Sequence, residues 1–298
     1  MTTTTGERAS RASVWIAACR PRTLPAAAAP VVVGAALAAH DGVFAAGPAA
    51  LALVGALLLQ IAANLANDYY DDVKGADGPD RLGPVRATAA GLVSRSAMRR
   101  AFIAVLAAST VVGAALVAIG GWPILAIGVA GILCAVLYTG GPFPLAYLGL
   151  GEVFVFVFFG PVAVAGTYYV QSHTAPLSVV VAGIAPGLLS SAVLMVNNLR
   201  DVESDARASK KTLVVRFGRP FVRSLYVLAI VGAGLSLVPL IPRFGFGVLA
   251  AWSATALGLA LARHVVREDG RALNPRLGET ARLLIVHAVA LAVVVIAR

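Results

Sequence analysis

The chain has 298 residues, of which 59% are hydrophobic and only 13% are charged, and its 24 Lys and Arg against 14 Asp and Glu give a net charge of +10. A water-soluble domain of this length needs more polar surface than such a composition supplies, which excludes the soluble globular class and indicates a lipid bilayer as the solvent. Nucleic-acid binding is also excluded as an explanation of the positive charge, because the basic residues lie in short segments between long apolar stretches.

The predicted elements start after a Thr-rich segment, residues 1–12, which we expect to be a disordered tail ahead of a single transmembrane domain at 13–298. A membrane-spanning helix needs about 20 mainly apolar residues. Nine stretches meet this requirement, at 23–40, 45–64, 101–120, 122–139, 151–170, 177–197, 222–241, 244–263 and 280–297. The pattern therefore predicts an all-α, polytopic membrane bundle of about nine transmembrane helices.

The basic residues are distributed unevenly between the two ends of these predicted helices. If the N-terminus is cytoplasmic, the inner segments hold 22 of the 24 Lys and Arg, and only Arg243 and Arg298 fall outside. This asymmetry follows the positive-inside rule and predicts an N-in, C-out orientation. The inner connections also carry the clusters of acidic residues, so we expect function on the cytoplasmic side.

The second predicted helix ends in a cluster of amides and carboxylates. Its members Asn64, Asn67, Asp68 and Asp71 follow the spacing i, i+3, i+4 and i+7, which places them on one face of a helix. Stacked like charges destabilise a helix, and asparagines in an apolar helix are costly unless they are used. The alternative interpretation is that these residues are solvated charges at a helix end. Stacked carboxylates together with asparagines inside an apolar helix favour a bound cation instead.

The sixth predicted helix ends in a similar cluster, in which Asn198, Asp201 and Asp205 share a face. Hard oxygen ligands of this type suit Mg²⁺, which binds one or two carboxylates and completes its shell with water and phosphate oxygens. Two such clusters that face each other would hold a diphosphate between them. Basic residues that would neutralise a leaving diphosphate lie beside both clusters, at Lys74, Arg81, Arg86, Arg200 and Lys210.

Several further residues have two possible interpretations. Arg20 and Arg22 flank Pro21 at the start of the first helix, where they either bind the carboxylate of a ligand or anchor the topology. Tyr138 ends the fourth helix and is either an interfacial tyrosine or a residue of the central site. Glu152 begins the fifth helix as either a site residue or a carboxylate at a helix N-terminus.

The two clusters resemble the signatures of the UbiA superfamily of intramembrane prenyltransferases. The similarity lies in Asn-Asp-x-x-Asp at 67–71 and Asp-x-x-x-Asp at 201–205. Within the superfamily the chain is similar to the branch that prenylates 1,4-dihydroxy-2-naphthoate in menaquinone biosynthesis, through residues 64–75, 80–86, 138–142, 158–161 and 197–218. The similarity starts at 20–25 and covers nearly the whole chain. Gly75 and Ser209 depart from the superfamily pattern, and Asp72 or Asp77 would substitute for the carboxylate missing at Gly75.

The resemblance implies a helical bundle with a central cavity and a site with assigned roles. Mg²⁺ would be held by Asn67, Asp71, Asp201 and Asp205, and a polyprenyl diphosphate would ionise beside it for attack by an electron-rich ring. Asp68, Asp72 and Tyr138 would complete the catalytic set, with Asn64 and Asn198 among the substrate-binding residues. For the naphthoate branch the attack is accompanied by loss of carbon dioxide. The expected location is the bacterial plasma membrane, with the site facing the cytoplasm.

Two alternatives stay open at this point. The first is another aromatic acceptor, such as 4-hydroxybenzoate or homogentisate. The second is a secondary transporter, since intramembrane acids also form ion pathways. Transporters place such acids near the membrane midplane, whereas here they lie at the inner ends of helices beside basic loops, which favours a diphosphate site.

Overall fold

The computed structural model describes residues 10–76, 81–142 and 144–298, which form helices and contain no strand. Within these ranges eight helical segments are long and apolar enough to cross a membrane. They are Arg11–His40, Ala46–Val73, Arg95–Leu137, Gly151–Ser172, Leu177–Arg207, Leu213–Phe244, Phe246–Val265 and Gly270–Ile296. The predicted all-α, polytopic membrane architecture is confirmed.

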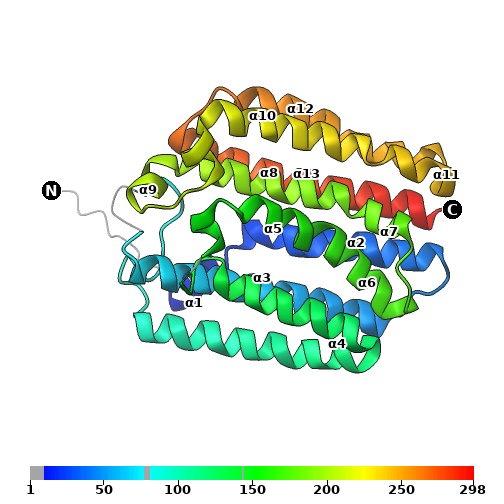
Figure 1. Cartoon of the computed structure of the whole chain (residues 1–298), viewed down its shortest axis with the longest axis horizontal. Coiled ribbons are helices and arrows are strands. Elements are labelled where there is room, and N and C mark those ends of the chain that lie inside the picture. The colour runs from blue at the N-terminus through cyan, green and yellow to red at the C-terminus, as the bar shows by residue number, and fades with distance from the viewer. Residues whose placement is uncertain (1–9, 77–80, 143) are drawn as a thin grey trace.

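One of the eight segments contains two of the nine predicted spans. Helix α4 (Arg95–Leu137) has 43 residues and would be roughly 65 Å long if it were straight, about twice the hydrocarbon thickness of a bilayer. The chain bends at Gly121, where φ is 69° and ψ is −154°, a conformation that glycine adopts without a steric penalty. Figure 1 shows α4 running along the edge of the bundle and then returning alongside α3 (Ala46–Val73).

The first span is a broken helix. Helix α1 (Arg11–Ala18) leads through the short 3₁₀ turn η1 (Pro21–Thr23) into α2 (Leu24–His40), and the break lies at Arg20, whose φ is 51°. Most of the tail predicted for 1–12 lies outside the described residues. Its last part is helical, because α1 begins at Arg11 and the Ser10 side chain caps it by accepting from the Ser13 amide at 3.1 Å.

The middle of the chain forms two further broken helices. In the first, α5 (Gly151–Val157) continues through the π-helical turn η3 (Phe158–Val162) into α6 (Ala163–Ser172). In the second, α7 (Leu177–Ala182) leads into α8 (Ile184–Arg200), and α9 (Val202–Arg207) follows. Glycines let these helices pack closely, since a Cβ added at Gly187 of α8 would lie 2.5 Å from the carbonyl oxygen of Phe156.

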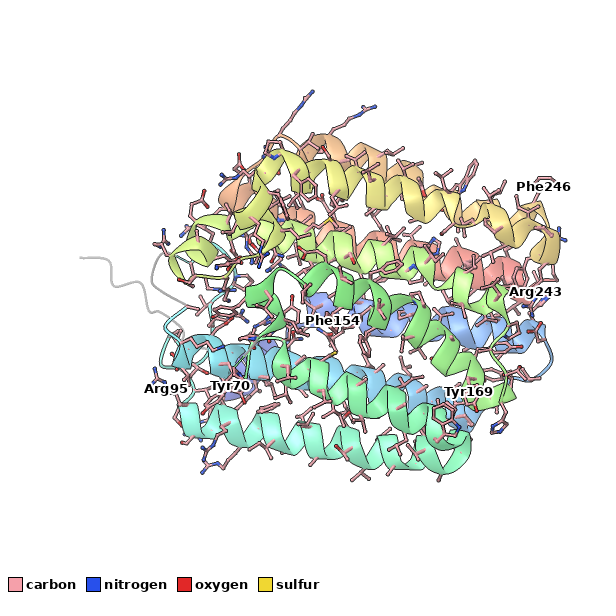
Figure 2. All side chains as sticks on the ribbon, in the orientation of Figure 1. Tyr70, Arg95, Phe154, Tyr169, Arg243 and Phe246 are labelled. Atoms are coloured by element: carbon pink, nitrogen blue, oxygen red, sulfur yellow. The ribbon has the colours of Figure 1, made fainter. Side chains whose placement is uncertain are left out.

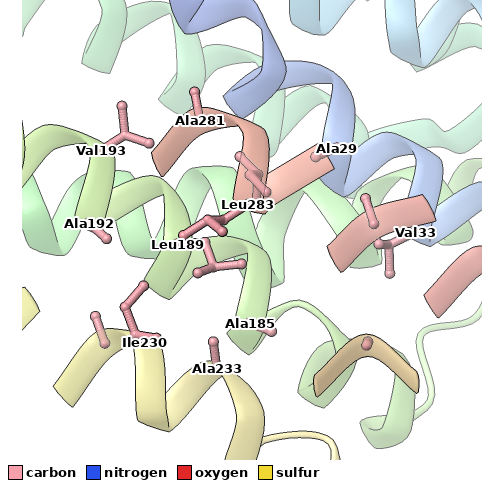
Figure 3. Close-up of a cluster of buried hydrophobic side chains, with 14 of the residues drawn as sticks. Ala29, Val33, Ala185, Leu189, Ala192, Val193, Ile230, Ala233, Ala281 and Leu283 are labelled. Atoms are coloured by element: carbon pink, nitrogen blue, oxygen red, sulfur yellow. The ribbon is translucent and has the colours of Figure 1, made fainter. Parts of the chain in front are cut away.

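The C-terminal part consists of α10 (Leu213–Leu235), α12 (Trp252–Val265) and α13 (Leu273–Ile296). Short elements connect them: η4 (Val238–Leu240), α11 (Ile241–Phe244), η5 (Phe246–Ala251) and η6 (Gly270–Ala272). The main core lies where α2, α8, α10 and α13 meet, and Figure 3 shows Leu189 and Leu283 close together near its centre. A smaller core joins α1, α3 and α4 around Leu65.

The two helices that carry the acidic motifs, α3 and α8, end at the same end of the bundle. Figure 1 shows this end beside α9, with the C-terminus at the opposite end. The chain thus brings motifs separated by about 130 residues of sequence to one face of the molecule.

Candidate active site

A cavity of about 640 Å³ runs between α2, α3, α4, α5, α6 and α8. Along α3 its lining extends from Asp71 back to Ala52, roughly 28 Å at the helical rise. Most of this length is apolar, with small residues such as Gly55, Gly113 and Gly131 on its walls. The α9 end is charged and is lined by Asn67, Asp71, Arg81, Arg86, Tyr138, Asn198, Asp201, Asp205 and Lys210.

The first motif meets the second through Asp71. Its buried carboxylate lies 2.9 Å from Nζ of Lys210, which follows the second motif, and 3.6 Å from Nη2 of Arg86. Asn67, one turn earlier on the same face, accepts a hydrogen bond through Oδ1 from Oγ1 of Thr139 at 2.8 Å. Residues of both clusters therefore line one cavity, which is the arrangement that the predicted site needs.

The second motif presents Asp201 and Asp205 to the cavity from the junction of α8 and α9. Arg200 donates to both carboxylate oxygens of Asp201, from Nε at 2.8 Å and from Nη2 at 2.5 Å. Its other bonds reach the side-chain oxygens of Asn197 at 2.8 Å and Asn274 at 3.2 Å. Arg200 is 2% exposed and does not line the cavity. Arg200 thus orients Asp201 in this structure, and its contact with the diphosphate stays a prediction.

Asp68 and Asp72, which were predicted for the catalytic set as partners of the metal ligands, do not line the cavity. Asp68 accepts from the backbone amides of Ala87 and Thr88, both at 3.1 Å. Asp72 accepts from Nε of Arg95 at 2.5 Å near the surface. The physical reason is helical phase: each acid follows a cavity residue by one position, a rotation of about 100° around α3.

Three predicted substrate-binding residues, Arg22, Lys74 and Asn64, make contacts outside the cavity. Arg22 is exposed and does not line the cavity, whereas Arg20 lines it. Lys74 lies outside the cavity lining, where its ammonium donates to the Thr139 carbonyl at 2.5 Å and covers the Tyr147 ring at 4.5 Å. Burial there lowers the pKa of Lys74. Asn64 does line the cavity, but its amide also fastens α3 to the first span.

Asn64 on α3 is hydrogen-bonded to the break between α1 and α2. Nδ2 of Asn64 donates to the Cys19 carbonyl at 3.0 Å and to Oγ1 of Thr23 at 2.9 Å. Arg20 in turn donates from Nη2 to the Asn64 carbonyl at 3.4 Å. These bonds hold Arg20 at the α3 side of the cavity.

The cavity contains residues that the motifs alone did not assign. Glu152 is 5% exposed and accepts a hydrogen bond through Oε1 from Nδ2 of Asn198 at 2.8 Å. Asn197 lies four residues before Asp201, so helical spacing was a signal that could have placed it. Nothing in the spacing singled out Ser190, which also lines the cavity. Tyr138 packs against Gly151, which precedes Glu152 in the chain, since a Cβ added at Gly151 would lie 3.0 Å from the Tyr138 hydroxyl oxygen.

The donor set at the charged end fits magnesium together with a phosphate ligand. Among the described residues no three His, Cys, Asp or Glu side chains form a cluster that would enclose a metal ion by themselves. Mg²⁺ does not require one, since it typically uses one or two carboxylates and keeps water and phosphate oxygens as its other ligands. Asp71, Asp205 and the amide oxygen of Asn67 supply suitable donors. Asp77 and Asp80 lie outside the described residues.

Fold and site together define a polytopic helical membrane protein whose cavity joins a long apolar compartment to a charged end suited to a phosphorylated ligand. The chain belongs to the UbiA prenyltransferase family, whose model matches residues 27–278. It is 41% identical over 288 residues to 1,4-dihydroxy-2-naphthoate octaprenyltransferase of Escherichia coli (strain K12), covering 93% of both chains. It is 42% identical over 285 residues to the protein of the same name in Mycobacterium tuberculosis, covering 93% of this chain and 95% of that one.

Solved structures support the fold. A UbiA homolog from Archaeoglobus fulgidus bound to GPP and Mg²⁺ superimposes with a TM-score of 0.63 at 14% identity, over 94% of this chain and 99% of that one. A UbiA homolog from Aeropyrum pernix K1 gives a TM-score of 0.67 at 15% identity, over 89% and 97%. Membership of a prenyltransferase family rules against the secondary-transporter interpretation.

Proposed function

We propose that this protein is an aromatic prenyltransferase that transfers a polyprenyl group from its diphosphate to 1,4-dihydroxy-2-naphthoate, with loss of carbon dioxide, in menaquinone biosynthesis. The observation that carries the proposal is identity above 40% across 93% of the chain to relatives named for this acceptor. The cavity supports it, because it combines a charged end for the diphosphate with an apolar length for the prenyl chain.

The diphosphate would bind at the charged end. Lys210, Arg81 and Arg86 line this end and offer cationic contacts to phosphate oxygens. Magnesium bound by Asn67, Asp71, Asp201 and Asp205 would supply positive charge that stabilises the leaving diphosphate. Asp201 can bind a metal ion while it accepts the two hydrogen bonds from Arg200, because a carboxylate has about four lone-pair sites.

The transfer makes one carbon–carbon bond and breaks two bonds. The allylic C–O bond breaks and its electron pair leaves with the diphosphate. The ring carbon that bears the carboxylate bonds to the allylic carbon, and the C–CO₂ bond then breaks and returns its pair to the ring. The apolar walls exclude water that would otherwise capture the allylic carbon. No net proton is released when the acceptor enters as its carboxylate.

The protein is a multi-pass membrane protein, and we place it in the bacterial plasma membrane with the charged end toward the cytoplasm. The support for this orientation is the concentration of 22 of the 24 Lys and Arg in the segments that the sequence predicts to be cytoplasmic.

The test is a product analysis with purified protein. A labelled polyprenyl diphosphate with 1,4-dihydroxy-2-naphthoate and Mg²⁺ should give a decarboxylated prenyl naphthalene and one diphosphate, and chelation of divalent ions should stop the reaction. Efficient prenylation of 4-hydroxybenzoate with its carboxylate retained, and none of the naphthoate, would overturn the acceptor but leave the prenyltransferase assignment standing. Absence of transfer to every acceptor would overturn both.

A further inference from the structure

We propose that the wall of the cavity formed by α5 and α8 is the acceptor subsite, in which Glu152 accepts a hydrogen bond from a ring hydroxyl of the acceptor and Ser190 makes a second polar contact. This inference rests on the proposed function and goes beyond it, because it assigns the residues that recognise the hydroxyl groups and the orientation of the ring.

The first observation is a carboxyl group held in the cavity without a cation bonded to it. Glu152 is 5% exposed, lines the cavity and has its Oε1 oriented by the Asn198 amide at 2.8 Å. Among the described residues no salt bridge to Lys or Arg is formed by Glu152, unlike Asp71 with Lys210. A carboxyl group with remaining acceptor capacity in a buried site suits a hydroxyl donor. A negative charge on Glu152 repels a diphosphate, so this wall favours a different part of the ligands even though Asn198 also lines the charged end.

The second observation is a buried hydroxyl that faces the same cavity without a partner. Ser190 is 2% exposed, and its Oγ has no hydrogen bond within the described part of the chain. The adjacent Ser191 has a different environment, since its Oγ donates to the Glu152 carbonyl at 2.9 Å. Leaving a buried hydroxyl unbonded is costly, so a polar group of a ligand at this wall would remove that cost.

The third observation is the shape of the space beside Glu152. The rings of Phe154 and Phe158 lie nearly parallel, with 6° between their planes and 6.3 Å between centroids, and both line the cavity. Figure 2 shows Phe154 near the middle of the molecule. The Tyr138 hydroxyl packs over Gly151, where an added Cβ would lie 3.0 Å from its oxygen. Aromatic side chains around a small-residue surface favour a flat aromatic ligand.

Charge fixes the orientation of that ligand. Arg20 lines the cavity beside α3, where its Nη2 donates to the Asn64 carbonyl at 3.4 Å, and Glu152 lines the cavity from α5. An acceptor that carries a carboxylate and hydroxyl groups is bound best with the carboxylate toward Arg20 and a hydroxyl toward Glu152, because the reversed orientation places two acidic groups together.

The test compares two naphthoates that differ in their hydroxyl groups. Binding of 1,4-dihydroxy-2-naphthoate and of 2-naphthoate is measured by titration of the purified protein under anaerobic conditions, without prenyl diphosphate or Mg²⁺. We expect the wild type to prefer the dihydroxy compound by about tenfold or more, because a hydrogen bond to a charged group contributes this much. Glu152→Gln should lower that preference about fivefold, and Ser190→Ala about threefold.

Ser236→Ala is the matched control, since its Oγ donates to the Ala233 carbonyl at 2.9 Å and it does not line the cavity, and it should leave the preference unchanged. An unchanged preference for the dihydroxy compound in both Glu152→Gln and Ser190→Ala would overturn the inference. If Glu152→Gln does not fold, the preference of Ser190→Ala alone tests the subsite. Wild-type turnover separates the outcomes: active wild type with unchanged variants rejects only the subsite, whereas inactive wild type rejects the proposed function.

Discussion

Asp71 and Asp72 are adjacent on α3 but lie in different environments. Asp71 is buried in the cavity beside Lys210, whereas Asp72 bonds to Arg95, whose side chain is 63% exposed. We expect Asp71→Asn to lower kcat at least about a hundredfold, because it removes a proposed metal ligand. Asp72→Asn should change kcat less than about twofold, since exposed ion pairs contribute little. Steady-state kinetics at saturating Mg²⁺ test both, and equal losses would contradict the assignment from helical phase.

The sequence predicted which residues of both motifs face the cavity, but it did not show where the side chains of their sequence neighbours point. Asn67, Asp71, Asp201, Asp205 and Lys210 were predicted as one site and line one cavity. The spacing i, i+3, i+4, i+7 spreads over a broad arc of a helix, so it could not show which acids face the cavity and which face the adjoining loop. Likewise, Arg20 rather than Arg22 reaches the cavity because the helix breaks at position 20. Arg20 has a positive φ of 51° there, and no sequence pattern predicts that backbone conformation for an arginine.

At the scale of elements, the loop residues 81–94 before α4 carry Arg86 and are fastened at two points. Asp68 accepts from the amides of Ala87 and Thr88, and Asn274 of α13 donates from Nδ2 to the Leu82 carbonyl at 2.9 Å. The loop therefore depends on side chains from two distant helices. This explains how a segment without regular secondary structure presents its arginine to the cavity.

The Asp68 contact leads to a prediction about local stability. Asp68→Ala removes both acceptors, so the amides of Ala87 and Thr88 should exchange with deuterium about tenfold faster or more. Hydrogen exchange followed by mass spectrometry measures this, and Asp72→Ala is the matched control because it bonds to Arg95 instead. Unchanged exchange in Asp68→Ala would show that the loop is held by other contacts.

Spans were predictable from hydropathy, but the breaks within them were not. The apolar stretches 101–120 and 122–139 were separated correctly at Gly121, because a span has a limited length. The π-helical turn at η3 and the break between α7 and α8 lie inside uniformly apolar sequence. At η3 a local cause is present, because the non-helical Gly160 precedes Pro161, which removes a helical hydrogen bond. Close contact of Gly160 with Gly183 and Gly187 adds tertiary packing, which leaves no periodic signal.

At the scale of the whole molecule, a polar cluster joins several helices at the end opposite the active site. Oδ2 of Asp41 accepts from the Tyr168 hydroxyl and from Nη2 of Arg243, each at 2.5 Å, and Arg243 also donates to Ser178. These residues follow or belong to α2, α6, α7 and α11. The cluster therefore ties the first span to the middle and the C-terminal part of the bundle.

This cluster predicts a pH-dependent stability. Burial alone would raise the pKa of Asp41, but the hydrogen bonds from Arg243 and Tyr168 and the charge of Arg243 outweigh it, and the pKa is lowered. A carboxyl whose folded pKa lies below its unfolded value of about 3.9 stabilises the fold above that pH and loses the contribution as pH falls through the folded pKa.

Asp41→Asn should therefore cost about 1–2 kcal/mol at pH 7 and lower the apparent Tm in detergent. The difference in Tm between this variant and the wild type should shrink as the pH falls from 7 toward 3. A difference that stayed constant over this range would show that the lost packing, rather than the charge of Asp41, is responsible.

The distribution of charge makes a final prediction about how the molecule lies in its membrane. The basic segments gather at the α9 end, and Figure 1 places the C-terminus at the other end. With the two native cysteines replaced by Ser, single cysteines at Ser94 and Ser209 should be accessible only from the cytoplasm, and those at Phe44 and Thr174 only from outside. All four positions are exposed. A membrane-impermeant maleimide applied to intact cells and to inverted vesicles measures this difference. Labelling of position 209 in intact cells would overturn the N-in orientation, because the positive-inside rule requires that segment to face the cytoplasm.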